Sequence, residues 1–363
     1  MTDYSISSDT VMTSQIGLGA TIHEGILSTI GNTPLVRLRH ALNRTGLRLF
    51  GKLEALNPGG SVKDRPAWEM IRRGLETGAI RPDTVIIESS SGNMAIGLAQ
   101  ACRYLNLRFI CVVDRKTTAQ NLKILQAYGA EMDLVSEPDP ATGEYLPARL
   151  ARVQWLLKSI RNSFWPNQYA NQWNASAHRH GTMPEIVNAL GQDIDYLFCA
   201  TGTCGTVTGC AEYVHEQGLK TKVIAVDAVG SVIFGGPKAK RLIPGHGAGI
   251  KPSLCREELI ERCIHVSDLD CVIGCRRLLT HEAILLGGSS GGVLTAVAQM
   301  QHEIASGATC VLILADRGER YLDTIYSDTW VKAHFGHVPE LDSLRVDPAE
   351  LTVSFHTAQL MNA

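Results

Sequence analysis

The sequence predicts an α/β fold in which parallel sheets carry helices on both faces. Short apolar runs rich in β-branched residues alternate with amphipathic helical patterns along the chain. This alternation is typical of strands that are buried on both sides and joined by crossover helices. Small-residue loops follow several of the runs, and ligands bind beyond the carboxyl ends of such strands.

The strands and helices can be placed approximately from these patterns. We expect strands at residues 84–88, 108–114, 196–200, 222–227 and 309–316. We expect helices at about 94–104 and 121–128. The small-residue loops at 90–93, 202–206 and 287–291 then follow strand-like runs, so they are candidates for one shared cleft.

Length and composition limit the class of protein. A chain of 363 residues with 45% apolar and 19% charged residues can bury a large core, and its length suggests about two domains. The net charge of −2 argues against nucleic acid or an anionic membrane as partner. The first 25 residues lack the features of a signal peptide, and no apolar run is long enough to span a bilayer. We therefore expect a soluble, cytoplasmic protein.

The cysteines and histidines do not predict a metal site. The ten cysteines include no Cys-x-x-Cys pair, and we expect them to be mostly buried thiols in a reducing compartment. Cys271 and Cys275 are expected as buried small residues of a helix. His178 and His180 have no third ligand nearby in sequence.

Lys63 is the principal catalytic candidate. It follows Gly59, Gly60 and Ser61 at the expected start of a helix. A P-loop lysine would be followed by Ser or Thr, but Asp64 follows Lys63. The alternative is a Schiff-base lysine that holds pyridoxal phosphate, with a separate glycine-rich loop for the phosphate. That alternative also accounts for the other small-residue loops.

Five motifs together resemble the β-family (fold type II) of pyridoxal-phosphate enzymes, which includes cysteine synthase and cystathionine β-synthase. The resemblance covers roughly residues 25–330, and the motifs lie at 31–35, 61–65, 91–93, 202–206 and 288–291. It implies a tryptophan synthase β-like fold, with two open twisted sheets flanked by helices. It also implies pyridoxal 5'-phosphate as cofactor and a homodimer.

The resemblance assigns a role to each motif. Lys63 would form the aldimine with the cofactor and then move the substrate α-proton. Asn93 would bond the ring hydroxyl, and Ser289 would face the pyridine nitrogen. A neutral serine there favours β-elimination to an aminoacrylate, followed by addition of a nucleophile. The phosphate cup would comprise Gly202, Thr203, Cys204, Gly205 and Thr206. Cys204 stands where the family usually has glycine.

The expected substrate contacts surround these cofactor residues. The α-carboxylate would bind the loop formed by Ser90, Ser91, Gly92 and Met94. Cysteine synthases carry a second threonine where this chain has Met94, which counts against a plain cysteine synthase. Arg149 is the candidate for a phosphate leaving group, with an exposed helix arginine as the alternative. Gln168 and Tyr169 follow it, and for Tyr169 substrate contact and packing are both open.

Four further motifs resemble one branch of the family, the N-(2-amino-2-carboxyethyl)-L-glutamate synthases that begin 2,3-diaminopropionate formation for siderophores and peptide antibiotics. They lie at residues 167–171, 227–235, 315–323 and 326–330. The resemblance implies O-phospho-L-serine and L-glutamate as substrates and a separate oxidase acting next. The alternatives are a cysteine synthase or cystathionine β-synthase with a sulfur nucleophile, and a non-catalytic sensor or scaffold. The retained lysine and cofactor loops count against a non-catalytic protein.

We expect the fold to divide into two domains with short extensions. The small, mobile substrate-binding domain would comprise residues 26–34 and 58–175, and the large cofactor-binding domain residues 35–57 and 176–335. Residues 1–25 would form a polar extension and 336–363 a tail. Closure of the small domain would exclude water from the reaction.

Overall fold

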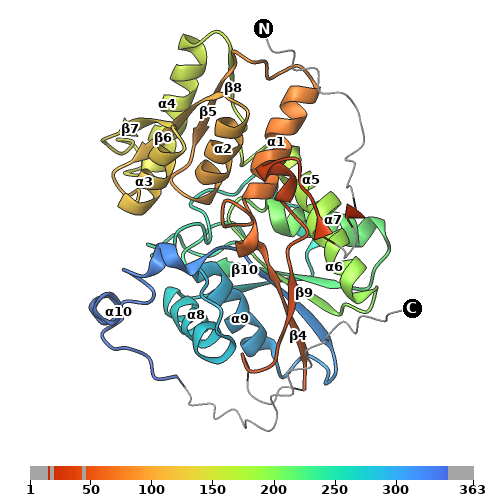
Figure 1. Cartoon of the computed structure of the whole chain (residues 1–363). Helices are drawn as coiled ribbons and strands as arrows, with labels where there is room; N and C mark the ends of the chain where they lie inside the picture. Colours follow the sequence, from red (N-terminus) through yellow and green to blue (C-terminus); the bar gives the residue numbers. More distant parts are fainter. Residues whose placement is uncertain (1–14, 17–19, 43–45, 342–363) are drawn as a thin grey trace.

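The computed structural model describes residues 15–16, 20–42 and 46–341. Its two main sheets lie in separate layers of the molecule (Figure 1). One sheet has six strands in the order β11-β10-β9-β12-β4-β3, and the other has four in the order β7-β6-β5-β8. A short antiparallel pair, β1 (Gln15–Ile16) and β2 (Ala20–Thr21), precedes them.

The six-stranded sheet is parallel except at one edge, where β3 runs antiparallel to β4. At its centre Val311 of β12 pairs with Leu197 of β9 and Phe50 of β4. All six residues of β12 are buried, as expected for a strand covered on both faces. The strands are β3 (Leu35–Leu38), β4 (Arg48–Leu53), β9 (Tyr196–Ala200), β10 (Lys222–Ala228), β11 (Arg262–Val266) and β12 (Thr309–Leu314).

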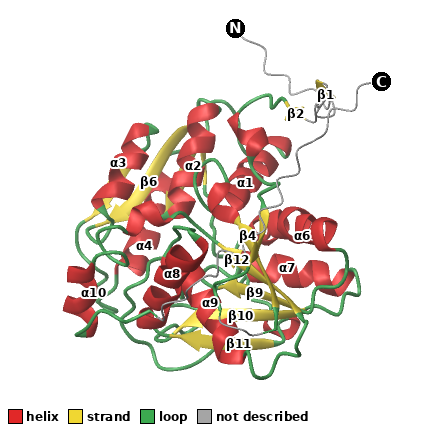
Figure 2. Ribbon diagram, turned by 60° about the horizontal axis from the view of Figure 1, so that its bottom comes forward, coloured by secondary structure: helices red, strands yellow, loops and turns green. Residues whose placement is uncertain are grey.

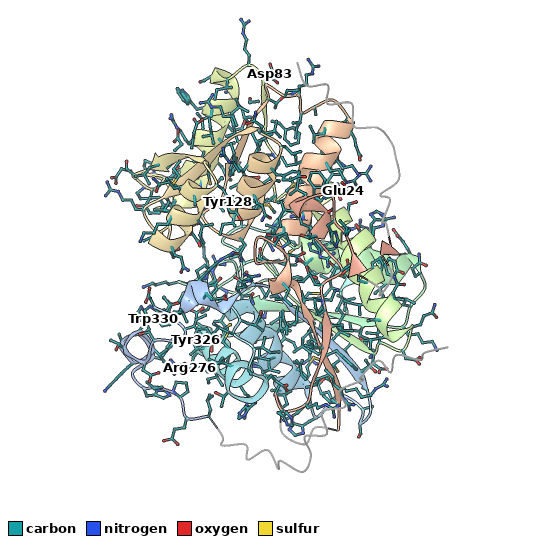
Figure 3. All side chains as sticks on the ribbon, in the orientation of Figure 1. Glu24, Asp83, Tyr128, Arg276, Tyr326 and Trp330 are labelled. Carbon is teal, nitrogen blue, oxygen red and sulfur yellow. The ribbon has the colours of Figure 1, made fainter. Side chains whose placement is uncertain are left out.

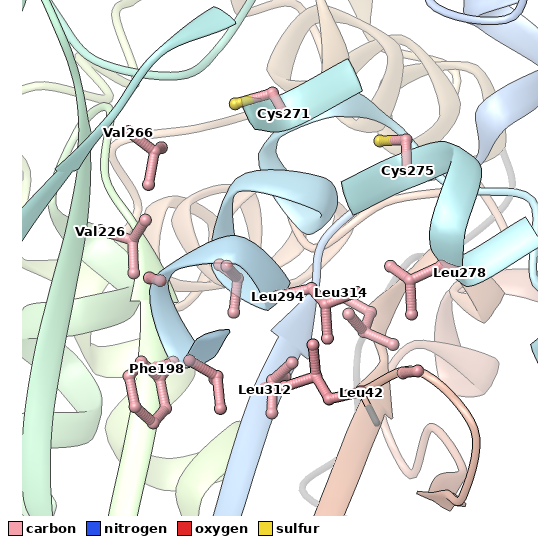
Figure 4. Close-up of a cluster of buried hydrophobic side chains, with 14 of the residues drawn as sticks. Leu42, Phe198, Val226, Val266, Cys271, Cys275, Leu278, Leu294, Leu312 and Leu314 are labelled. Atoms are coloured by element: carbon pink, nitrogen blue, oxygen red, sulfur yellow. The ribbon is translucent and has the colours of Figure 1, made fainter. Parts of the chain in front are cut away.

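Two helices cover each face of this sheet (Figure 2). Leu312 and Leu314 of β12 pack with α8 and α9, and Figure 4 shows this buried cluster. Val311 and Ile313 point to the opposite face and pack with α6 and α7, because side chains alternate along a strand. The helices are α6 (Met183–Leu190), α7 (Gly205–Glu216), α8 (Asp268–Glu282) and α9 (Gly288–Met300).

The four-stranded sheet is wholly parallel and is also covered on both faces. Ile86 and Cys111 pack toward α1, α2 and α3, whereas Ile87 and Val112 pack toward α4. Its strands are β5 (Val85–Ser89), β6 (Arg108–Asp114), β7 (Glu131–Val135) and β8 (Ser163–Phe164). Its helices are α1 (Asp64–Glu76), α2 (Asn93–Tyr104), α3 (Ala119–Ala127) and α4 (Tyr145–Ser159).

Shorter elements connect the two layers. Helix α5 packs against both α1 and α7, so it joins the helical covers of the two sheets. The remaining elements are α5 (Gln172–Ala177), the π-helical turn η3 (His178–Thr182), α10 (Asp328–Phe335), and the short helices η1 (Ile26–Thr29), η2 (Glu54–Leu56), η4 (Glu257–Leu259) and η5 (Gly318–Tyr321).

The predicted fold class is confirmed, and the five expected strands lie within two residues of their predicted ends. Cys271 and Cys275 are buried on α8, as predicted. Strand β4 was not predicted, and it contains Lys52, a charged residue that is nonetheless fully buried. The domain boundaries at residues 58 and 175 stay a prediction. Among the described helices, none has the length and apolar character needed to cross a bilayer.

A buried ionic network fixes the start of α1. Arg65 donates to both oxygens of Glu54, at 2.6 and 2.8 Å, and to both oxygens of Glu185, each at 2.7 Å. Lys52 adds a 2.6 Å bond to Glu185. Burial alone would raise the pKa of Glu185, but the hydrogen bonds and charges of Arg65 and Lys52 outweigh it and lower the pKa to about 2. The network therefore joins β4, η2, α1 and α6.

Glu185→Gln should lower the free energy of unfolding by about 3–5 kcal/mol at pH 7, because it leaves Lys52 buried without a carboxylate. The pKa of Glu185 is lowered by folding, so its carboxylate stabilises the fold above the ordinary pKa of 4.5. That contribution is lost as the pH falls through about 2. Urea denaturation at several pH values should therefore show the variant and wild type converging in acid.

Glu131→Gln is the matched control for this variant. Glu131 also receives two hydrogen bonds from one arginine, Arg108, but both side chains are about half exposed. Its removal should cost at most about 1 kcal/mol. Equal losses for the two variants would contradict a stabilising role of the buried network.

Candidate active site

A cavity of about 520 Å³ lies where loops from both sheets meet. From the four-stranded sheet it is lined by residues that follow β5 and β6, and from the six-stranded sheet by residues that follow β9, β10 and β12. The loops therefore converge at the carboxyl ends of parallel strands, as the sequence predicted.

Most of the predicted site residues line this one cavity. They are Lys63, Ser90, Ser91, Gly92, Asn93, Met94, Arg149, Gln168, Tyr169, Gly202, Thr203 and Ser289. Cys204, Gly205 and Thr206 do not line it. They are buried directly behind Thr203, where Cys204 caps α7 and the other two begin its first turn. Met94 also belongs to the buried apolar cluster of the four-stranded sheet. The chemical roles assigned to these residues stay predictions.

Elements near the C-terminus close one side of the cavity. Trp330 of α10 lines it, and Figure 3 shows Trp330 near Tyr326 and Arg276. The Tyr326 hydroxyl donates to the carbonyl of Leu286 at 2.6 Å, and Arg276 bonds Asp328 at 2.6 Å. These contacts hold the segment before α10 against α8 and the loop that leads to α9.

Lys63 is held at the junction of the two layers. It caps the N-terminus of α1, and its backbone N–H donates to the Ser61 hydroxyl at 3.2 Å. The neighbouring N–H of Val62 donates to the carbonyl of Ala315, which directly follows β12, at 2.7 Å. Burial lowers the pKa of the Lys63 amine, and the negative charge of Asp316 opposes that change. A lowered pKa suits an amine that must act as nucleophile and base.

Asp316 is a site residue that the sequence analysis missed. Its Oδ2 accepts hydrogen bonds from the Asn93 amide at 2.8 Å and from the Tyr321 hydroxyl at 2.6 Å. Arg320 donates to the Asn93 side-chain oxygen. Burial raises the pKa of Asp316, and the bonds from Tyr321 and Asn93 oppose the rise. An Asp immediately after a continuous apolar strand was the available signal for it.

The N-terminus of α7 faces the cavity through Gly202 and Thr203. Gly205 packs so closely that a Cβ there would lie 2.0 Å from the side-chain oxygen of Asn174. Asn174 in turn donates to the Thr203 hydroxyl at 3.1 Å and to the Gln168 carbonyl at 2.7 Å. This packing fixes a helix N-terminus beside the cavity, which suits an anion.

Cys204 adopts the backbone conformation that glycine usually supplies. Its φ of 64° is left-handed, which costs a non-glycine residue roughly 1–3 kcal/mol. Its side chain is buried in the cluster beneath the six-stranded sheet. Contact with the Cys255 thiol and burial both raise the pKa of Cys204. The side chain that departs from the family pattern thus points into the core.

The two serines at the start of α9 differ in surroundings. Ser289 lines the cavity. Ser290 is fully buried, and its hydroxyl accepts a 2.9 Å hydrogen bond from the backbone of Ala315. Ser290 therefore has a structural role at the start of the helix.

Arg149 and Tyr169 lie on the four-stranded-sheet side of the cavity. Arg149 Nε lies 3.2 Å from Asp114 Oδ2, but neither Nε nor Nη1 makes a hydrogen bond within the described part of the chain. Burial raises the pKa of Tyr169, and the charges of Arg149 and Arg241 oppose the rise. The positive charges of two arginines therefore act on the Tyr169 hydroxyl.

Gln168 forms hydrogen bonds with other residues of the protein. Its side-chain amide donates to the Ser89 carbonyl and its backbone N–H to Glu88, both at 3.2 Å. Burial raises the pKa of Glu88 to about 7. Gln168 thus ties the Tyr169 loop to the end of β5.

The histidines singled out in the sequence do not lie together as ligands. His178 is fully buried, with its two ring nitrogens 2.9 Å from the Thr182 hydroxyl and 3.3 Å from the Thr206 hydroxyl. Elsewhere in the described ranges, Asp227, Cys263 and His265 form one group whose donor atoms lie within 4.8 Å of one another. The expectation that the protein binds no metal stays a prediction.

Comparison with known proteins identifies the family. The family model described as "Pyridoxal-phosphate dependent enzyme" matches residues 26–316. The chain belongs to this family. Its cofactor is therefore pyridoxal phosphate.

Solved structures narrow the group within the family. The O-acetylserine-dependent cystathionine β-synthase of Helicobacter pylori is 31% identical, with a TM-score of 0.79 over 84% of this chain and 99% of that one. The O-acetylserine sulfhydrylase isoform 3 of Entamoeba histolytica is 30% identical, with a TM-score of 0.79 over 88% and 93%. An O-ureido-L-serine synthase is 27% identical, with a TM-score of 0.78 over 84% and 94%. The protein is thus a fold type II β-replacement enzyme of the cysteine synthase and cystathionine β-synthase group.

The cavity residues fit this cofactor. Lys63 offers an amine of lowered pKa for an aldehyde. The start of α7 offers backbone N–H groups for a phosphate, and Gly205 lies where a Cβ would collide with Asn174. Ser289 offers a neutral hydroxyl from the start of α9.

Borohydride reduction of the holoenzyme should fix the pyridoxyl mass on the peptide that contains Lys63. Lys52 is the internal comparison, because it is also buried but is paired with Glu185 at 2.6 Å and is not among the residues that line the cavity. Peptide mass spectrometry distinguishes the two. Label on any lysine other than Lys63, or no label, would refute the assignment.

Proposed function

We propose that this enzyme joins O-phospho-L-serine and L-glutamate into N-(2-amino-2-carboxyethyl)-L-glutamate and phosphate. The bond from the serine β-carbon to oxygen breaks, and a bond from that carbon to the glutamate nitrogen forms. A separate oxidase then releases L-2,3-diaminopropionate for a siderophore or peptide antibiotic. We further propose that the enzyme acts as a cytoplasmic homodimer.

The main support for this proposal is the positive charge of the side chains that line the cavity. Besides Lys63, its lining includes four cationic side chains, Lys116, Arg149, Arg241 and Arg320. Among the described lining residues Asp316 is the acidic one. A phosphorylated substrate and a dicarboxylic amino acid bring several negative charges, which require cations or oriented donors. A reaction with an acetate leaving group and a sulfide nucleophile brings fewer negative charges and would not require so many cations.

In the proposed mechanism Lys63 performs the proton transfers. Pyridoxal phosphate, when bound, supplies the electron sink that makes the substrate α-proton acidic and the β-substituent a leaving group. Lys63 Nζ takes the α-proton, and burial favours the neutral amine that this step requires. After glutamate has added, the same amine returns a proton to the α-carbon.

Two further groups orient the phosphoserine. Ser90, Ser91 and Gly92 precede α2, and the Ser90 hydroxyl accepts a 3.2 Å bond from Ala95 N–H. This loop would bind the α-carboxylate at the helix N-terminus. Arg149, supported by Lys116 on the same side, would neutralise the departing phosphate with its two unbonded N–H groups. Closure of the small domain would exclude water meanwhile.

Arg149→Ala should weaken the use of O-phosphoserine by roughly tenfold or more, as expected for loss of a charged hydrogen bond in a desolvated site. The matched control is Arg152→Ala on the same helix, because Arg152 pairs with Asp133 near the surface. Steady-state kcat/KM for O-phosphoserine measures the effect. Equal activity in both variants would remove the role of Arg149 and leave the reaction itself standing.

Ser289→Asp should retain the cofactor but lose most turnover. An aspartate facing the ring nitrogen would keep the ring protonated and stabilise a long-lived carbanion at the expense of β-elimination. Cofactor absorbance confirms loading, and phosphate release from O-phosphoserine measures turnover. Undiminished phosphate release would contradict the electronic argument.

The function is tested by offering the enzyme O-phosphoserine with a mixture of amino acids, sulfide and homocysteine. Mass spectrometry should find N-(2-amino-2-carboxyethyl)-L-glutamate, in amounts that match the phosphate released. Cystathionine or cysteine as the main product would instead support the sulfur-nucleophile alternative, which the relatedness to a cystathionine β-synthase and a sulfhydrylase keeps open.

A further inference from the structure

Among the described residues, Arg241 is one of the cavity cations that lack an acidic partner. Arg241 lines the cavity and forms no ion pair with a carboxylate in the described part of the chain, and its Nε is buried without a hydrogen bond. The other two arginines that line the cavity contact polar groups of the protein. Arg149 lies beside Asp114, and Arg320 donates to Asn93 and to the carbonyl of Gly59. A half-buried guanidinium with an unbonded N–H is costly unless an anion joins it.

The backbone holds Arg241 in place. The N–H groups of the next two residues, Leu242 and Ile243, donate to the two carboxylate oxygens of Asp268 at 2.8 and 3.2 Å. A nitrogen of the Arg241 guanidinium packs over Gly247, only 2.8 Å from where a Cβ would lie. Gly247 itself donates to the Thr201 carbonyl at 2.8 Å. The arginine is therefore preorganised before a ligand binds.

We propose that Arg241 binds the side-chain carboxylate of the acceptor amino acid, so that it selects glutamate over neutral acceptors. This inference rests on the proposed function. An arginine suits the task because its planar fork matches a carboxylate in a bidentate geometry.

The position of Arg241 favours the acceptor over the phosphoserine. The groups assigned to phosphoserine, namely the loop before α2 and Arg149 of α4, belong to the four-stranded-sheet layer. Arg241 instead follows β10 of the six-stranded sheet. Leu242, Ile243 and Pro244 line the cavity next to it, and they offer apolar surface to the methylene groups that separate the two carboxylates of glutamate. Tyr169 lines the same cavity, and the charges of both Arg149 and Arg241 act on its hydroxyl.

The test separates the two halves of the reaction in the holoenzyme. In Arg241→Gln, phosphate release from O-phosphoserine alone should stay within about twofold of wild type. The KM for L-glutamate should rise roughly tenfold or more, as for a lost charged hydrogen bond. The preference for glutamate over L-glutamine should fall accordingly, and Arg241→Lys should restore part of it. Lys240→Gln, an exposed change on the same loop, should behave as wild type.

A binding measurement accompanies the kinetics. Glutamate should raise the melting temperature of the wild-type holoenzyme by mass action, and this shift should be lost in Arg241→Gln. An unchanged KM and an unchanged shift would overturn the inference. Impaired phosphate release without glutamate would overturn it too, since Arg241 would then serve phosphoserine. If wild type itself does not consume glutamate, the proposed function fails first and the inference falls with it.

Discussion

The pairing of Arg65 with the carboxylates of Glu54 and Glu185 is the interaction on which the cavity's arrangement depends. Glu54 follows β4 and Glu185 lies on α6, both in the layer of the six-stranded sheet, whereas Arg65 begins the helix α1 that covers the other sheet. Lys63 lies two residues before Arg65. The Lys63 amine, which we propose to be the reacting group, is therefore placed by contacts to both layers. A lysine in place of Arg65 could not satisfy four carboxylate oxygens at once.

The same network shapes the electrostatics behind the proposed phosphate site. His178 is buried, and burial together with the charges of Arg65 and Lys63 lowers its pKa well below the ordinary value. It therefore stays neutral beside the Thr206 hydroxyl. A neutral imidazole can orient that hydroxyl by hydrogen bonding without adding a charge. The helix N-terminus then provides the attraction for an anion.

The sequence predicts what depends on local pattern and misses what depends on tertiary pairing. Continuous apolar runs located β5, β6, β9, β10 and β12, and the small-residue loops located Lys63, Asn93 and Ser289. Lys52 made β4 hard to recognise as a strand. A buried lysine is stabilised there by the Thr33 carbonyl and by the carboxylate of Glu185, which is far away in sequence. Arg241 was missed for the converse reason. The residues next to an arginine in the sequence do not show whether it will pair with a carboxylate in the folded protein.

Asn93 and Asp316 connect the two layers across the cavity, and this bears on the proposed closure of the small domain. Asn93 begins α2 in one layer, while Asp316 and Arg320 follow β12 in the other. The Asn93 side chain donates through its nitrogen and accepts through its oxygen, so both ends are engaged across the cleft. A cofactor hydroxyl that bonds Asn93 must share or displace one of these contacts. The Asn93 pairing therefore lets occupation of the cofactor site alter the contact between layers, which is the physical requirement for a ligand to bias a conformational equilibrium.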